Sequence, residues 1–401
     1  MTRRRLVRNG LLSGLNLAFS PMLNLGRLRL FASEPVEIST RAADLVLGTT
    51  VIDMLGLLTL DWSRLFRWQR RPGAFGEADF RELASSGVNV FHPAVDTGFV
   101  EPVQAALTWI EGWNLMLGSH VCRLAKVEAA PDLTRIPGTG RIGVIVGFQN
   151  STHFKKRGDV AKFFELGQRV SQLTYSERNA LGSGCYERRD RGLTAFGGEI
   201  VAAMNEVGMA IDVSHCGERT SLDAISASSR PVLITHGNCR ALNPGQPRCK
   251  SDAVIRKMAA GGGVMGITTV SAFVGRSPTV ETLIDHFVHV ARLTGVEHVG
   301  LGSDVDLQAV DPRSGKPLQF YAIKGLDPAA RVFQIADGLL HRGFNPRDVE
   351  LILGGNFRRV LSEIWPPVSE HAASRLEWRR DPFCPTPNPG MPDSVVTTRS
   401  R

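Results

Sequence analysis

The sequence predicts an α/β fold, a single (β/α)8 barrel of the TIM type. Eight short apolar runs recur over roughly 300 residues, and most are followed by a segment with apolar residues at helical spacing. Within residues 209–237, two such runs enclose one helix-like segment. This order is typical of a β-α-β unit, which requires parallel strands and a right-handed crossover. An open doubly wound sheet is the alternative.

The expected strands and helices alternate along the chain. The strands cover residues 49–58, 89–95, 142–150, 171–176, 210–215, 231–236, 263–270 and 298–306. The helices cover residues 75–87, 103–121, 159–170, 197–208, 252–262, 280–295, 328–342 and 346–365, besides the segment between the fifth and sixth strands. No GxGxxG follows the first strand and no GxxxxGK[ST] occurs, so the sequence does not predict nucleotide binding.

Composition divides the 401 residues into three parts. Residues 1–33 are a basic arm with six arginines and no acid, residues 46–365 are the barrel, and residues 366–401 are a proline-rich tail. The net charge of +8 therefore lies mainly in the arm, and the barrel has no basic stripe for nucleic acid. The six cysteines form no CxxC pair, so neither a disulfide scaffold nor a structural zinc module is indicated.

The arm begins with Arg3, Arg4 and Arg5 and continues into a short, moderately apolar stretch. Twin arginines before such a stretch resemble a twin-arginine export signal, which predicts a periplasmic protein. The alternative is an amphipathic arm that packs on the barrel or lies on a membrane surface, in a cytoplasmic protein. The arm is the only part of the sequence through which we expect the protein to associate with a membrane.

Two histidines end consecutive predicted strands. His215 closes AIDVSH and His236 closes PVLITH. The carboxyl ends of parallel strands line the mouth of a barrel, where active sites lie. Two imidazoles at one rim are suited to hold a metal ion, and the alternative is two unrelated histidines at loop starts.

Other strand ends add polar side chains to the same rim. A set of His, Asp and Arg is typical of hydrolytic metal sites, where imidazoles bind the ion, a carboxylate moves protons and a guanidinium holds a carboxylate. The candidates are Gln149, Tyr175, Arg248 and Asp304. We expect Asp53 to cap or orient the first loop, Asp306 to hold the last one, and His286 and His289 to be structural. His92 and Asp96 are either a replacement ligand pair or an ordinary loop pair.

Four stretches resemble the renal or membrane dipeptidase family: DVSHCGERTSLDAI, PVLITHG, HVGLGSDVD and GGNFRRVL. The resemblance spans about residues 46–365 and implies a barrel with two bridged zinc ions that hydrolyses dipeptides. It implies that His215 and His236 bind one zinc, that Arg248 holds the substrate carboxylate, and that Asp304 binds the substrate amine and relays protons.

The sequence departs from this family at three positions. Leu55 and Leu57 stand where the family has His-x-Asp after strand 1, Gln149 replaces the bridging Glu, and Tyr175 replaces a His that stabilises the tetrahedral intermediate. Leucine cannot bind zinc, and a neutral amide does not offset the repulsion between two cations. We therefore expect one zinc, held by His215, His236 and Gln149, with Tyr175 as an oxyanion donor.

These observations lead to a metal-dependent hydrolase of dipeptides or dipeptide-like small molecules with a reduced metal site. One alternative is a barrel that binds or modifies an amino-acid-like ligand without metal or peptidase activity. Another is a non-catalytic binding or maturation partner. A small zwitterionic ligand is expected in each case, and a homodimer is compatible with all of them.

Overall fold

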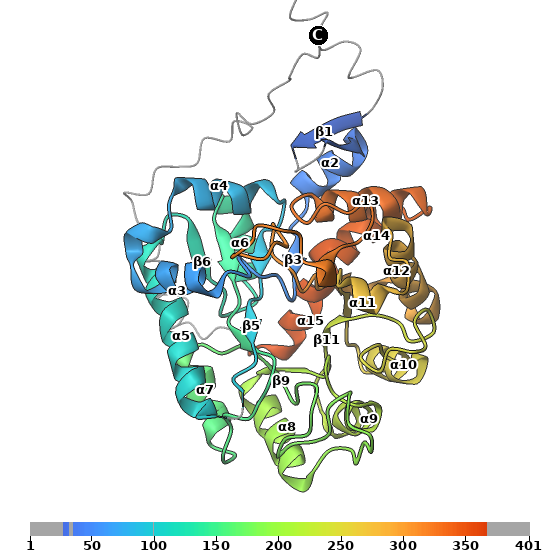
Figure 1. The fold of residues 1–401 in the computed structure, drawn as a ribbon. Coiled ribbons are helices and arrows are strands. Elements are labelled where there is room, and N and C mark those ends of the chain that lie inside the picture. Colours follow the sequence, from blue (N-terminus) through green and yellow to red (C-terminus); the bar gives the residue numbers. More distant parts are fainter. Residues whose placement is uncertain (1–26, 32–34, 99, 367–401) are drawn as a thin grey trace, which may run out of the picture.

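The computed structural model describes residues 27–31, 35–98 and 100–366 (Figure 1). Its barrel strands form a ring of parallel neighbours. Two of the barrel strands each consist of two short pieces, β4 (Val90–Phe91) followed by β5 (Ala94–Val95), and β7 (Ile142–Val144) followed by β8 (Gly147–Phe148). In both, the first piece belongs to one hydrogen-bonded sheet and the second piece to the other, so these strands join the two sheets. In order, the ring contains β3 (Ile52–Asp53), β4 (Val90–Phe91) with β5 (Ala94–Val95), β7 (Ile142–Val144) with β8 (Gly147–Phe148), β9 (Val170–Gln172), β10 (Ala210–Asp212), β11 (Ile234–Gly237), β12 (Met265–Ile267) and β13 (Val299–Leu301).

Two contacts close this ring. The last strand, β13, pairs in parallel with the first through Leu301 and Asp53. A parallel bridge between Asp212 and Leu233 joins the end of β10 to the residue before β11. The predicted α/β fold with parallel strands is therefore confirmed, and these pairings complete the expected barrel.

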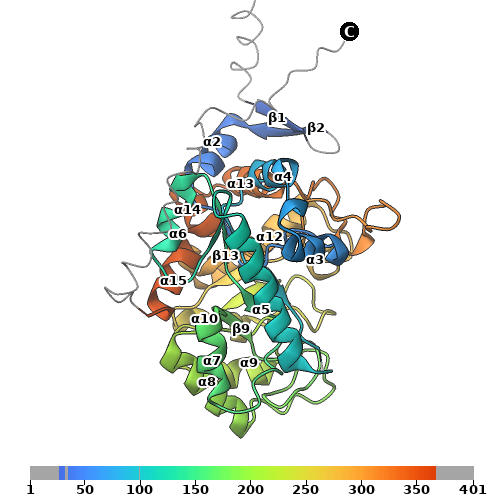
Figure 2. The ribbon, with the colours of Figure 1, turned by 90° about the vertical axis from the view of Figure 1, so that its left-hand side faces the viewer.

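Helices follow the strands on the outside of the barrel (Figure 2). Some of them begin at a side chain that accepts a first-turn N–H, as Thr194, Ser251 and Thr279 do, which is typical of helix N-caps. The helices are α4 (Glu77–Ser85), α5 (Pro102–Ser119), α7 (Asp159–Leu166), α8 (Ala195–Val207), α9 (Glu218–Ala227), α10 (Asp252–Ala260), α12 (Val280–Thr294), α13 (Arg331–His341), α14 (Pro346–Glu350) and α15 (Asn356–Ile364).

A π-helical segment, Leu351–Gly355, joins α14 to α15. The expected single helix over residues 346–365 is thus one continuous helical stretch with a wider turn inside it. A Cβ added at Gly354 would lie 2.0 Å from the carbonyl oxygen of Thr50. A glycine at this position therefore lets the segment approach the chain that leads into β3.

Several elements were not predicted. An antiparallel hairpin, β1 (Arg27–Phe31) and β2 (Pro35–Ser39), leads into α2 (Thr40–Gly48) before the first barrel strand. Ser39 caps α2 by accepting the Ala42 N–H, and its hydroxyl donates to Asp337 of α13. Shorter additions in the loops are α3 (Trp62–Arg70), β6 (Leu124–Lys126), α6 (Asp132–Arg135) and α11 (Ser271–Val274).

The apolar core lies between the barrel and its helices, whereas the strand ends carry buried polar groups. Trp113 and Phe357, both unexposed, pack in the outer layer. Polar residues on or near the strands are equally buried, among them Asp53, His92, Gln172, Asp212 and His236. Buried polar groups need partners, so this end of the barrel is held by hydrogen bonds as well as by packing. Within the described residues, no helix is long and apolar enough to cross a membrane.

Candidate metal and substrate site

The β10-α9-β11 unit brings the two predicted histidines together. His236 is part of β11, and His215 lies three residues beyond β10. Their Nε2 atoms are 3.1 Å apart. Two nitrogens that share one tetrahedral zinc, each about 2.0–2.1 Å from it, would be separated by about 3.3–3.4 Å. The spacing of the pair therefore fits a shared ion after a shift of a few tenths of an ångström.

The other nitrogen of each ring is held by a hydroxyl. His215 Nδ1 lies 3.0 Å from Ser176 Oγ, and His236 Nδ1 lies 2.8 Å from Thr235 Oγ1. Such contacts fix the orientation of each ring and leave Nε2 to face its neighbour. Burial lowers the pKa of both histidines well below its usual value, and the charge of Arg248 lowers each further. Both imidazoles are therefore neutral at pH 7, which is the form that binds a metal.

Tyr175 covers one face of the histidine pair. Its ring stacks on His215 with centroids 4.1 Å apart and an angle of 20° between the planes. Burial, aided by the negative charge of Asp304, raises the pKa of Tyr175 to about 12. The phenol is therefore protonated at neutral pH and can donate a hydrogen bond.

Arg248 is 1% exposed, yet part of its guanidinium has no partner. Nη2 donates to the carbonyl oxygen of His236 at 2.8 Å, and the guanidinium carbon lies 5.4 Å from the ring centre of Phe273. Among the described residues, nothing accepts from Nε or Nη1. Unsatisfied buried donors are costly, so two donors beside the histidine pair indicate a place for an anion.

Asp304 lies just beyond β13, the last barrel strand. Its φ of 60° is in the left-handed region, where Asp is tolerated better than most residues, and its N–H donates to Leu55 at 2.7 Å. Burial raises the pKa of Asp304 to about 7, although Arg248 opposes the shift. A carboxylate with a pKa near neutrality can both take and return a proton at physiological pH.

The structure places Gln149 differently from the other candidates. Its side-chain amide donates to the Ala94 carbonyl at 3.1 Å, and no contact joins it to either histidine within the described residues. In the same part of the chain, no cluster of three or more His, Cys, Asp or Glu residues could hold a metal. Two candidate ligands, His215 and His236, thus lie side by side, and Gln149 as the third remains a prediction.

The remaining polar residues have structural contacts. Asp306 accepts from Leu60, Gln308 and Ala309, as expected of a residue that holds the last loop. His92 Nδ1 contacts the Met54 carbonyl at 2.6 Å, while Asp96 accepts from Gly98 and Asn150. Among the described residues, His92 Nε2 is buried without a hydrogen-bond partner, and the replacement ligand pair stays a prediction. His286 bridges Cys239 and Val274, and His289 contacts Asp252.

Sequence reasoning missed several residues at the site. Arg331 is paired with Asp53 at 3.1 Å, and both side chains are fully buried. Tyr321 comes from the loop after the last strand, and its pKa is raised above the usual value by burial and by Asp304. No motif marks either residue, because each reaches the site only through the fold. The local sequence gives one hint of a buried Arg331: it is a charged residue between the apolar Ala330 and the apolar pair Val332 and Phe333.

The fold and site define a class of proteins: parallel α/β barrels with paired histidines, an arginine and an aspartate at the strand ends. Residues 44–374 match the family model described as membrane dipeptidase, peptidase family M19, and the chain belongs to that family. It is 29% identical over 248 residues to the dipeptidase tcpJ of Claviceps purpurea and 28% identical over 271 residues to the dipeptidase verJ of Clonostachys rogersoniana.

These alignments cover 60% and 66% of this chain, and the chain spans 56% and 66% of the two relatives. Among solved structures, an amidohydrolase from Pseudomonas aeruginosa has 27% identity and a TM-score of 0.66, over 81% of this chain and 99% of that one. The probable dipeptidase PvdM from the same organism has 15% identity and a TM-score of 0.70, over 81% and 98%. At 15% identity, the likeness to PvdM supports the fold alone.

Proposed function

We propose that this protein is a metal-dependent hydrolase that cleaves the peptide bond of dipeptides or dipeptide-like small molecules. The observation that carries the proposal is the pair of neutral imidazoles 3.1 Å apart, beside an arginine with unpaired donors. Membership of the membrane dipeptidase family supports it, as do the relatives described as dipeptidases. One zinc ion, bound by His215 and His236 with Gln149 as third ligand, is the expected cofactor.

When bound, the metal would activate water and polarise the carbonyl group of the substrate. Arg248 binds the carboxylate of the substrate through its free Nε and Nη1 donors. Asp304 accepts a proton from water and returns it to the amine that leaves, so that one water molecule is added across the amide bond. The Tyr175 hydroxyl donates to the oxyanion that forms in between. Asp304 also attracts the ammonium end of a dipeptide.

The test is the metal content of the purified protein, measured by elemental mass spectrometry. We expect about one zinc per chain, lost in His215→Ala and kept in His289→Ala, the matched control on the outer helix α12. Hydrolysis of a dipeptide panel should follow the metal. Two ions per chain would overturn the mononuclear site, because further ligands would then have to complete it.

A metal-free barrel protein that binds or modifies an amino-acid-like ligand is the second candidate. It is favoured by the side chain of Gln149, which contacts Ala94 rather than the histidines. A folded protein without metal that binds a dipeptide and does not cleave it would establish this alternative.

The N-terminal arm supports a further proposal, export to the periplasm by the twin-arginine route. Residues 1–26 lie outside the described part of the chain, so the sequence carries this proposal. Fusing residues 1–33 to a reporter tests it, with Arg3 and Arg4 changed to Lys as the control. A wild-type arm that leaves the reporter in the cytoplasm would reject export.

A further inference from the structure

A short segment after the sixth barrel strand runs beside the chain that carries His236. The Lys250 N–H donates to the Asn238 carbonyl at 2.8 Å, and the Arg240 N–H donates to the Lys250 carbonyl at 2.8 Å. A parallel bridge also pairs Cys239 with Lys250. The backbone of Lys250 is therefore fixed to the residues that directly follow His236.

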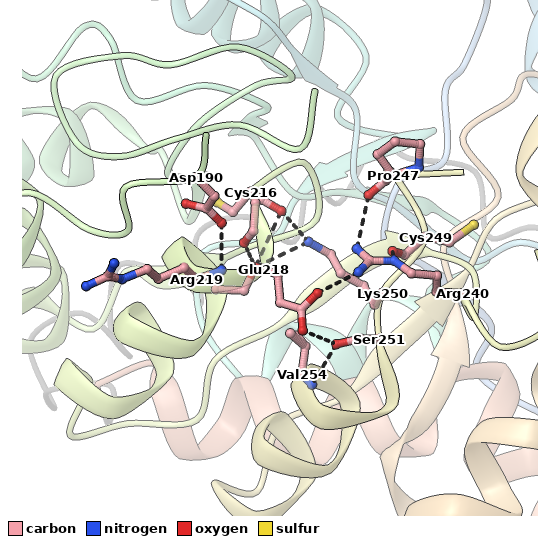
Figure 3. A network of polar contacts seen from close by, with 12 residues as sticks. Asp190, Cys216, Glu218, Arg219, Arg240, Pro247, Cys249, Lys250, Ser251 and Val254 are labelled. Carbon is pink, nitrogen blue, oxygen red and sulfur yellow. Dashed lines mark hydrogen bonds and ion pairs between the residues drawn. The ribbon is translucent and has the colours of Figure 1, made fainter. Parts of the chain in front are cut away.

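The side chain of Lys250 reaches the other histidine-bearing loop, as Figure 3 shows. Its Nζ donates to the carbonyl oxygens of Val213 at 2.6 Å and Cys216 at 2.8 Å, and to Ser221 Oγ at 3.3 Å. The residue is 3% exposed. A lysine ammonium has three donors, and all three have acceptors here, so none remains for a substrate.

The two carbonyl groups flank His215 in the sequence. Val213 precedes it by two residues, and Cys216 follows it directly. Lys250 thus connects the loop of His215 to the segment of His236 through one side chain and its own backbone. Lys250 also lies two residues after Arg248, so its contacts hold the segment that carries this arginine as well.

A second, more exposed connection runs parallel to the first. Arg240 Nη1 pairs with Glu218 Oε2 at 2.5 Å, and Ser251 Oγ donates to Glu218 Oε1 at 3.1 Å. Glu218 is the first residue of α9, which starts directly after the His215 loop (Figure 3). Because these side chains are partly exposed, solvent screens this pair, and the buried Lys250 contacts are the stronger constraint.

We propose that Lys250 is a positioning residue that sets the distance between His215 and His236 and thereby the affinity for the metal. The inference rests on the proposed metal-binding function. Two histidines can bind one zinc ion only if the distance between their Nε2 atoms is within a few tenths of an ångström of about 3.3–3.4 Å. Removing a group that orients a metal ligand commonly lowers the affinity for the metal by about 10–100-fold. Without the ammonium, the Val213 carbonyl keeps the Cys216 N–H at 3.1 Å and the Cys216 carbonyl keeps the Ser221 hydroxyl at 3.5 Å, but both lose their charged donor. The His215 loop is then no longer held to the segment of Lys250 by this side chain.

The experiment compares Lys250→Met with Arg169→Met. Methionine matches the unbranched lysine side chain up to its ε-carbon and removes the charged amino group. Arg169 is the matched control: it is 9% exposed and also donates to carbonyl groups, those of Phe164 and Glu128, which are partly buried, and that of Gln168, which is buried. It precedes β9 and so lies at the opposite end of the barrel. Zinc affinity is measured by competition with a chelator, and stability by urea unfolding.

Both variants should lose stability, but only Lys250→Met should bind zinc more weakly, by about 10–100-fold. Its cobalt-loaded form should also show an altered visible spectrum, which reports ligand geometry and is insensitive to stability. Should Lys250→Met fail to fold, Ser221→Ala removes only the longest of the three contacts, and a measurable loss of zinc affinity is expected there.

The two proposals fail in different ways. A wild-type protein that binds no zinc overturns the metal-binding function and this role with it. A wild-type protein that binds zinc, beside a folded Lys250→Met variant of equal affinity and spectrum, overturns the role of Lys250 alone. An equal loss of affinity in Arg169→Met would assign the effect to general destabilisation and would also overturn it.

Discussion

The substitution Asp53→Asn tests whether the first strand end is structural. Asp53 accepts from the N–H groups of Leu55 and Ser303, from the Ser303 hydroxyl, and from Arg331 Nη2. The Arg331–Asp53 pair is 3.1 Å long with both side chains fully buried. Asparagine has nearly the same shape but carries no charge, so Arg331 would be left as a buried cation without its anion.

Breaking such a pair by removing one partner costs about 3–5 kcal/mol of folding free energy, because the remaining charge stays desolvated. A domain of roughly 330 residues has an unfolding entropy of about 0.7 kcal/mol/K, so each kcal/mol lowers Tm by about 1.4 °C and a fall of about 4–7 °C is expected. Zinc content should stay unchanged, because the Asp53 carboxylate is held by Leu55, Ser303 and Arg331 and is not expected to bind the metal.

The assay is urea unfolding beside elemental analysis of the same preparations. Asp311→Asn serves as the control, since the Asp311 side chain accepts from the N–H groups of Arg313 and Ser314 in an exposed turn, and no measurable loss of stability is expected there. Two results for Asp53→Asn would refute the reasoning. A stability loss below about 1 kcal/mol would show that the pair is not buried as described, and loss of metal with full stability would make Asp53 a ligand.

Three further predictions concern the chemistry of the site. Arg248→Ala should weaken binding of a dipeptide by about 2–5 kcal/mol, measured calorimetrically, and should abolish the preference for that dipeptide over its C-terminal amide. Because the pKa of Asp304 is about 7, kcat/KM should rise with pH through this value, and Asp304→Asn should remove the rise. The raised pKa also means that this carboxyl makes folding less favourable as pH increases from about 4 to 7, a slope that Asp304→Asn should flatten. Tyr175→Phe keeps the ring on His215 and removes the hydroxyl, so kcat should fall by about 10²–10³ with zinc content unchanged; an unaltered kcat excludes the oxyanion role.

The histidine pair shows which parts of a site can be predicted from one sequence. His215 and His236 end two consecutive apolar runs, and the parallel order of such runs places their ends at one rim whatever the details of packing. The same reasoning placed Asp304 after the last strand. Strand order and rim position follow from local patterns, so the fold class and these residues could be predicted.

Contacts between distant residues could not be predicted in this way. Arg331 lies 278 positions from Asp53, and Lys250 lies 34 from Cys216, so no periodic pattern joins them. Gln149 occupies the expected strand end, but its side-chain amide donates to the Ala94 carbonyl. The orientation of this side chain depends on its neighbours in the folded chain and cannot be read from the sequence. The helix α2 was missed because its docking on α13 through Ser39 and Asp337 also arises only in the folded chain.

The charges around the first strand also bear on the number of metal ions. Leu55 and Leu57 are buried and offer no ligand, and the carboxylate of Asp53 is committed to Arg331 and Ser303. A second cation near this strand would meet the fixed positive charge of Arg331, and the paired carboxylate of Asp53 would not be free to offset it. Binding there would require breaking a fully buried ion pair, at a cost of about 3–5 kcal/mol before any new bond is formed. These contacts support the proposal that a single ion binds at the histidine pair, because a second ion at the first strand would disrupt an ion pair that stabilises the barrel.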